Sequence, residues 1–149
     1  MSIFEAFAIS ASGLTAERLR MDVISNNIAN ANVTKTAEGG PYARQRVVFE
    51  PRGEKLGFLF PAIFDQNKRI SQFQGVKVTG ILKDPAPPKL VFDPGHPDAN
   101  EAGYVAMPNV NIVKEMVDMI SATRAYEANV TAINSAKTMA AKALDIGRI

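Results

Sequence analysis

The hydrophobic pattern is helical at both ends of the chain and alternating between them. Over residues 3–32, apolar side chains recur at steps of three and four, which predicts one amphipathic helix. Gly13 lowers its helix propensity by about 1 kcal/mol relative to alanine, so this helix would be marginal alone. All nine prolines lie within residues 41–108, so neither end is interrupted by a helix breaker. The stripe of the first helix comprises Phe4, Phe7, Ala11, Leu14, Arg18, Met21, Ser25 and Ile28.

The C-terminal residues predict a second, longer helix. Asn109 or Asn111, after Pro108, offers a cap for its first turn, and Gly147 offers a stop. Residues 112–146 at about 1.5 Å each make a rod of roughly 50 Å, which is long for a compact domain and natural for an assembled shaft. The apolar ladder has heptad spacing and consists of Ile112, Met116, Met119, Thr123, Tyr126, Val130, Ile133, Lys137, Ala140 and Leu144.

The residues between the helices predict a small β-rich insert. Alternating side chains over residues 46–50 and 76–83 indicate two strands, and residues 90–92 a third. Residues 85–88 are a proline-rich link, and residues 93–103 are an ordered loop of Pro, Gly, Asp and Asn. Three short strands bury little, so neighbouring elements must stabilise them. We therefore predict an α+β protein of three parts: a helix in residues 1–36, the β-rich domain in residues 37–108 and a helix in residues 109–149.

Composition narrows the possible partners. The chain has 149 residues, enough for one domain, and a net charge of +2 without a basic block, so nucleic-acid binding is not expected. The absence of cysteine excludes disulfides and suits an oxidising compartment, although many small bacterial proteins lack cysteine. The first positive charge is Arg18, so no cleavable signal is predicted, and by signals alone the chain looks cytosolic. The apolar run of residues 56–64 is too short to span a bilayer. Such a run usually belongs to the hydrophobic core, or forms an interface if it is exposed.

The sequence carries little catalytic chemistry. His96, the only histidine, lies in a run of Pro, Gly and Asp that favours a turn over a metal or acid–base site. Phosphate-loop, nucleophile-elbow and zinc-protease motifs are not found in the sequence. We predict no enzyme activity, no catalytic residue, no cofactor, no metal and no small-molecule substrate.

Two polar clusters interrupt the helical stripes. Residues 25–32 contain four asparagines, which either cap a fraying helix end or fix register across a helix interface. Residues 121–129 combine small side chains with Tyr126 and the charged pair Arg124 and Glu127. This second cluster is either an ordinary helix surface or a place where helices approach closely.

These clusters resemble the paired signatures of the rod, hook and hook-associated axial proteins of the bacterial flagellum. The N-terminal signature corresponds to residues 12–14 (Ser-Gly-Leu) and 26–30 (Asn-Asn-Ile-Ala-Asn), and the C-terminal one to residues 109–116 and 124–129. The short length of the chain is similar to that of proximal rod members, because distal rod and hook members carry larger inserted domains. Residues 39–49, 93–99 and 103–110 also match one proximal rod member, whereas Val33, Ala43 and Asn111 depart from the family's usual residues.

The resemblance implies a structural subunit of the proximal rod, the axial drive shaft. Such proteins leave the cytoplasm unfolded through the type III export apparatus without a cleaved signal and assemble helically across the periplasm. Their terminal helices pair as a coiled coil that lines the export channel, and the β insert forms the outer shell. Implied partners are further copies, the rod proteins FlgB, FlgF and FlgG, FliE and the membrane ring. An export motif of the family would fit residues 60–64.

The expected assembly interface draws on both terminal helices. Alternatives are the neighbouring rod subunit FlgB, disfavoured by the loop of residues 93–104, or a monomeric periplasmic binding module with a polar-lined pocket. The expected interface residues are Phe4, Phe7, Leu14, Met21, Asn26, Asn27, Ile28, Asn30, Met116, Ile120, Arg124, Tyr126, Asn129, Val130, Ile133 and Leu144.

Overall fold

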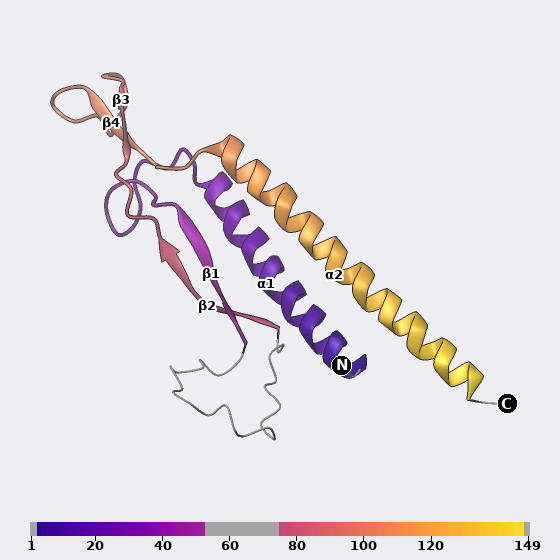
Figure 1. Ribbon diagram of the computed structural model, residues 1–149. Helices are drawn as coiled ribbons and strands as arrows, with labels where there is room; N and C mark the ends of the chain where they lie inside the picture. Colours follow the sequence, from indigo (N-terminus) through magenta and orange to yellow (C-terminus); the bar gives the residue numbers. More distant parts are fainter. Residues whose placement is uncertain (1–2, 53–74, 148–149) are drawn as a thin grey trace, which may run out of the picture.

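The chain folds as two long helices with two small antiparallel sheets between them in sequence (Figure 1). The computed structural model describes residues 3–52 and 75–147; the apolar run of residues 56–64 and the export motif at residues 60–64 lie outside the described residues. The prediction of an α+β protein is confirmed. The elements are α1 (Ile3–Ala29), β1 (Gln45–Pro51), β2 (Val76–Lys83), β3 (Lys89–Phe92), β4 (Tyr104–Met107) and α2 (Ile112–Ile146).

The two helices lie side by side and run in opposite directions (Figure 1). The predicted caps of α2 are confirmed: the Asn111 side chain accepts a hydrogen bond from the Lys114 backbone N–H, and Gly147 is the C-cap. α1 ends at Ala29, three residues before the predicted end, because Asn30 turns its side chain back onto the carbonyl of Asn26. In the part of the chain that the structure describes, neither helix has a stretch apolar enough to cross a bilayer.

The side of α2 that faces α1 is rotated by about one residue from the predicted ladder. Met119, Tyr126, Ile133 and Ala140 are shared by both and are at least half-buried. Two more ladder residues, Thr123 and Val130, are also half-buried, and the Thr123 hydroxyl lies 3.6 Å from the Met21 sulfur on α1. The ladder was wrong at four positions that are exposed, namely Ile112, Met116, Lys137 and Leu144. It also missed three buried positions, Glu115, Ala122 and Ala136. The physical reason is distance, because small side chains allow the two backbones to approach closely, whereas hydrophobicity alone favours the larger residues.

One close approach explains Gly13. A Cβ atom built at this position would lie 3.0 Å from the side-chain nitrogen of Asn129 on α2. The glycine that weakens α1 locally therefore makes room for a polar side chain of the partner helix. The lower intrinsic propensity is offset by packing, which is the usual source of helix stability in proteins.

β1 and β2 form an antiparallel pair that lies along α1 (Figure 1). The predicted alternation is confirmed for the first half of β2, where Val76 and Val78 are half-buried and Lys77 and Thr79 are exposed. Leu82, expected on the same face as the valines, is largely exposed. A register shift between Val48 and Phe49 in β1 separates the two halves of the ladder.

Hydrogen bonds fix this sheet to α1 at both of its ends. At one end, the Ser12 hydroxyl accepts the backbone N–H of Val76 and donates to the carbonyl of Ile9. Gly75 adopts a φ of +89°, and a Cβ there would collide with the Ser12 hydroxyl, so only glycine fits. At the other end, Asn27 binds the backbone of Gln45.

The second sheet pairs β3 with β4 and projects beyond the end of the helix pair (Figure 1). β4, which directly follows the predicted loop of residues 93–103, was not predicted. Phe92 and Tyr104 face each other across the strands, with their ring centroids 5.3 Å apart in an edge-on arrangement. All four residues of β3 are exposed, whereas Val105 of β4 is fully buried, so this hairpin joins the core through β4 alone.

Candidate functional site

A buried asparagine joins α1, β1 and α2. The side chain of Asn27 is 1% exposed. Its amide nitrogen donates to the Gln45 carbonyl at 2.8 Å and to Glu115 Oε2 at 2.9 Å. Its carbonyl oxygen accepts the Gln45 N–H and the Tyr42 hydroxyl, both at 2.9 Å. All four hydrogen-bonding positions of the amide are used, which fixes its orientation.

An arginine and a glutamate complete this connection. Glu115 is fully buried on α2, and its Oε1 accepts a hydrogen bond from Arg44 Nε at 2.7 Å. Arg44 also lies 3.5 Å from a carboxylate oxygen of Asp118 and 3.7 Å from one of Asp84. We call Asn27, Tyr42, Arg44, Gln45 and Glu115 the polar junction, because they hold the start of β1 against both helices.

The junction shifts the pKa values of two of its groups. Burial opposes the charged form of Arg44, but the hydrogen bond to Glu115 and the charges of Glu115, Asp118 and Asp84 outweigh it and raise its pKa. The pKa of Tyr42 is raised by burial and by the neighbouring negative charge of Glu115. Arg44 therefore stays charged, and Tyr42 stays a hydrogen-bond donor, at any physiological pH.

A groove beside the polar junction is lined by several charged side chains. It lies between α1, β1 and the first turns of α2, with Arg20, Arg44 and Asp118 among its lining residues. Both of these arginines are already paired with carboxylates, Arg44 as described above and Arg20 with Glu17 and Asp118. The described residues also contain no cluster of side chains that could hold a metal ion. Arg20 and Arg44 are therefore compensated within the molecule, whereas Arg46 and Lys114 also line the groove.

His96 lies in a turn, as predicted. Its Nδ1 accepts a hydrogen bond from the backbone N–H of Asp98 at 3.1 Å, and the backbone N–H of His96 donates to the Asp93 carbonyl. A further bond from Thr34 to Asp98 attaches this loop to the segment that follows α1. The contacts of His96 are those of a turn residue.

The first turns of α2 expose a continuous apolar surface on the side away from α1. Val113 is 71% exposed and Val117 61%, which is unusual for valine in a folded domain. We call this surface the outer stripe. Its members are Ile112, Val113, Met116, Val117 and Ile120.

The structure separates the predicted interface residues by their exposure. Asn27 alone is buried, with the internal contacts described above. Those with exposed side chains are Phe4, Asn26, Met116, Ile120, Arg124 and Leu144. Half-buried, mostly between the helices or toward the sheet, are Phe7, Leu14, Met21, Ile28, Asn30, Tyr126, Asn129, Val130 and Ile133.

Both interpretations of the asparagine cluster apply, to different residues. Asn26 and Asn30 bond to each other at 2.7 Å where the helix ends, as caps do. Asn27 instead fixes the register of three elements. Glu115 and Tyr42 were not predicted as site residues. The predicted ladder placed Met116 rather than Glu115 on the inward side of α2, so hydrophobic periodicity gave no signal for Glu115.

Known protein families match both helices. A family model described as "Flagella basal body rod protein" matches residues 7–35, and one described as "Flagellar basal body rod FlgEFG protein C-terminal" matches residues 101–146. The two matches cover most of α1 and all of β4 and α2. They define a structural class, the rod proteins of the flagellar basal body.

Full-length relatives identify the member of this class. The chain is 52% identical over 151 residues to the flagellar basal-body rod protein FlgC of Borreliella burgdorferi, covering 98% of each chain. It is 45% identical to FlgC of Bacillus subtilis and 38% identical to FlgC of Escherichia coli O6:H1, covering 99% of this chain and 100% of each relative. The chain belongs to the FlgC family. It is a structural subunit of the flagellar rod, and the prediction of this subunit rather than FlgB is confirmed.

Proposed function

We propose that this chain is a proximal rod subunit that polymerises through its terminal helices, transmits torque and lines the export channel. The observation that carries this proposal is the outer stripe, because apolar side chains so exposed on one face of a long helix call for a partner surface. In this proposal α1 and α2 act as a coiled coil, and contacts between unlike ends of successive subunits give an open polymer.

The polar junction supports the torque-transmitting part of this proposal. A drive shaft must turn as one body, so its outer domain has to keep a fixed angle to its core. Asn27 and the Arg44–Glu115 pair fix β1 to both helices with buried, directional bonds. In this scheme residues 1–36 and 109–149 form the core domain and residues 37–108 the outer domain.

Membership of the family implies assembly with other rod and basal-body components and a place in the basal body. We propose FlgB, FlgF, FlgG, FliE and the membrane ring as the specific neighbours. We further propose that the subunit passes through the type III export apparatus, without a cleaved signal, into a rod that spans the periplasm. Its role is structural rather than enzymatic, and the interface is drawn from the residues named in the sequence analysis.

Electron microscopy of cells tests this proposal. The only copy of the gene would carry Ile133→Asp, which places a charge on the side of α2 that faces α1. Thr131→Asp, an exposed position two residues away, is the matched control. We expect Ile133→Asp cells to make the protein but to lack hooks and filaments, and control cells to be flagellated. Normal flagella in Ile133→Asp cells would contradict assembly through the terminal helices and favour the binding-module alternative.

A further inference from the structure

The loop between β3 and β4 contains three turns of one kind, each closed by a side chain that accepts the backbone N–H two residues ahead. In the first and third turns, side-chain oxygens of Asp93 and Asn100 accept this bond, at 3.2 and 3.1 Å. In the middle turn, Nδ1 of His96 accepts the N–H of Asp98 at 3.1 Å. An imidazole nitrogen accepts a hydrogen bond only while it carries no proton, so the middle turn depends on the protonation state of His96.

The middle turn loses its acceptor at a pH at which the other two turns keep theirs. His96 is the only histidine of the chain. Histidine side chains ordinarily gain a proton between about pH 8 and pH 5. Amides do not titrate in this range, and aspartate side chains ordinarily gain a proton only below about pH 5. His96 is therefore the member of the three that responds to pH near neutrality.

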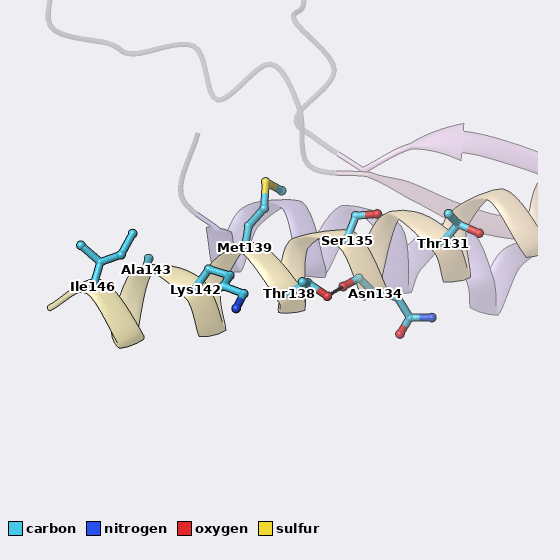
Figure 2. Close-up of a pocket in the computed structure, with 8 residues that line it drawn as sticks. All are labelled: Thr131, Asn134, Ser135, Thr138, Met139, Lys142, Ala143 and Ile146. Atoms are coloured by element: carbon cyan, nitrogen blue, oxygen red, sulfur yellow. Dashed lines mark hydrogen bonds between the residues drawn. The ribbon is translucent and has the colours of Figure 1, made fainter. Parts of the chain in front are cut away.

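The hollow along the last turns of α2 contains no comparable group (Figure 2). Its lining combines hydroxyl, amide and apolar side chains, and Lys142 is the single charged member. The Thr138 hydroxyl there donates to the Asn134 carbonyl at 2.9 Å, so it is used within the helix. Hydroxyl, amide and lysine side chains ordinarily keep their charge state near neutral pH, so this surface has no pH-sensitive group of that kind.

Asp98 also attaches the β3–β4 loop to another part of the molecule. Its Oδ2 accepts a hydrogen bond from the Thr34 hydroxyl at 2.7 Å, and Thr34 lies on the segment that follows α1. The two residues are 64 positions apart in sequence. We call the bond between Thr34 and Asp98 the loop latch, because it joins the loop to the segment after α1.

Protonation of His96 acts on the loop latch through the same carboxylate oxygen. His96 Nδ1 lies 4.0 Å from Asp98 Oδ2, the oxygen that accepts the Thr34 hydroxyl. A protonated ring is a positively charged donor, and hydrogen bonds from charged donors to carboxylates are about twice as strong as neutral ones. The imidazolium therefore competes with the Thr34 hydroxyl for this oxygen, and the backbone N–H of Asp98 loses its acceptor.

Asp98 provides the main charge beside the His96 ring. In residues 3–52 and 75–147, it is the one carboxylate within 4.0 Å of a His96 ring nitrogen. The loop's two further carboxylates are Asp93, which closes the first turn, and Glu101, which is exposed. On the segment after α1, the latch residue is followed by Lys35, which is also exposed. The interaction of His96 with Asp98 is therefore the one that changes when the ring gains a proton.

We propose that the loop latch is pH-sensitive: uptake of a proton by His96 opens the middle turn and releases Asp98 from Thr34. The latch is closed while Nδ1 is free to accept a hydrogen bond, and it opens as the pH falls and the ring is protonated. The change is local to the folded chain, so it is independent of the proposed manner of rod assembly.

Nuclear magnetic resonance of the isotope-labelled full chain tests this proposal from about pH 8 to pH 5. The single histidine gives one set of ring signals. Hydrogen exchange of the amides in residues 93–103, corrected for the intrinsic effect of pH, reports whether the loop is closed. His96→Asn is the control, because an asparagine oxygen does not titrate and accepts the same kind of bond in the third turn. Thr34→Val removes the loop latch and serves as the reference for the open loop.

In the wild type, we expect the Asp98 amide to exchange roughly fivefold faster at the acidic end, which corresponds to the loss of one hydrogen bond. This change should share its midpoint with protonation of the His96 ring. The other loop amides should approach the exchange rates of Thr34→Val. The His96→Asn variant should stay closed at every pH of the series.

The proposal is overturned if His96 gains its proton while exchange in the loop stays constant, or if His96→Asn shows the same rise. It is also overturned if Thr34→Val exchanges like the wild type at the alkaline end. Hydrogen exchange and mass spectrometry of loop peptides from purified basal bodies apply the same criteria to the assembled chain. Where the free and the assembled chains differ, the assembled chain decides.

Discussion

At the scale of single residues, the most informative side chains are polar and buried. Asn27 and Glu115 are separated by 88 positions in sequence, yet they share a hydrogen bond inside the molecule. Each is satisfied by partners from a different element, Asn27 by Gln45 and Tyr42, and Glu115 by Arg44. A buried polar group is tolerated only when it is paired in this way, so the junction depends on all of its members together.

Glu115→Ala should be strongly destabilising. It leaves Arg44 without its closest partner and Asn27 without an acceptor, and breaking a buried ion pair costs about 3–5 kcal/mol of unfolding free energy. Lys114→Ala, the exposed neighbour on the same turn, should change stability by no more than about 0.5 kcal/mol. Urea unfolding followed by circular dichroism measures both variants. Equal stabilities for the two would show that the junction does not hold the fold.

At the scale of elements, small side chains decide how the helices pair. Small residues at Gly13, Ala122 and Ala136, rather than large aliphatic ones, allow α1 and α2 to pack closely. The sequence predicted the caps and length of α2 correctly, because capping depends on residues that are neighbours in the chain. It assigned Met116 to the contact with α1, because hydrophobicity alone cannot distinguish a side chain that packs on α1 from one that is exposed.

Ala122→Leu should push the helices apart. Ala122 is fully buried against α1, and adding three carbon atoms to a packed site costs about 1–3 kcal/mol. Ala128→Leu, on the exposed side of the same helix, is the control and should leave the melting temperature nearly unchanged. Thermal unfolding compares the two. If Ala122→Leu melts at the control temperature, the close approach of the helices is not required for stability.

At the scale of the whole molecule, the fold joins the helix pair to the β1–β2 sheet and leaves the outer stripe exposed. The sheet of β1 and β2 is attached to α1 at both ends, by Ser12 and by Asn27, and the polar junction extends the attachment to α2. The outer stripe stays exposed at the N-terminal end of α2. A subunit built in this way can pass force along its helices and outward to its β-rich domain.

The junction should make stability depend on pH in the alkaline range. Since the pKa of Tyr42 is raised above its ordinary value of 10.0, the folded chain holds the phenol proton more tightly than the unfolded chain. The stabilisation is complete below pH 10.0 and is lost as the pH rises through the raised pKa of the folded state. Tyr42→Phe should therefore show a shallower fall in unfolding free energy above that pH than the wild type.

Urea unfolding at a series of pH values from 8 to 11 measures this dependence. Tyr104→Phe, which changes an exposed tyrosine outside the junction, provides the control. An unchanged alkaline slope in Tyr42→Phe would mean that the phenol is not coupled to folding.

The sequence by itself determined the elements that depend on nearby residues: two terminal helices, the stop at Gly147, the turn at His96 and most of the strands. It narrowed the cap of α2 to Asn109 or Asn111, and the structure shows that Asn111 is the cap. The paired signatures also determined the family, since they are sequence motifs that occur together at the two ends of the chain. Only the tertiary structure decided that Glu115 meets Asn27 and Arg44, and that the outer stripe faces away from α1. These features depend on the register and the rotation of two helices that are far apart in sequence. Small side chains at the close contact between the helices set this geometry, and hydrophobic periodicity does not encode it.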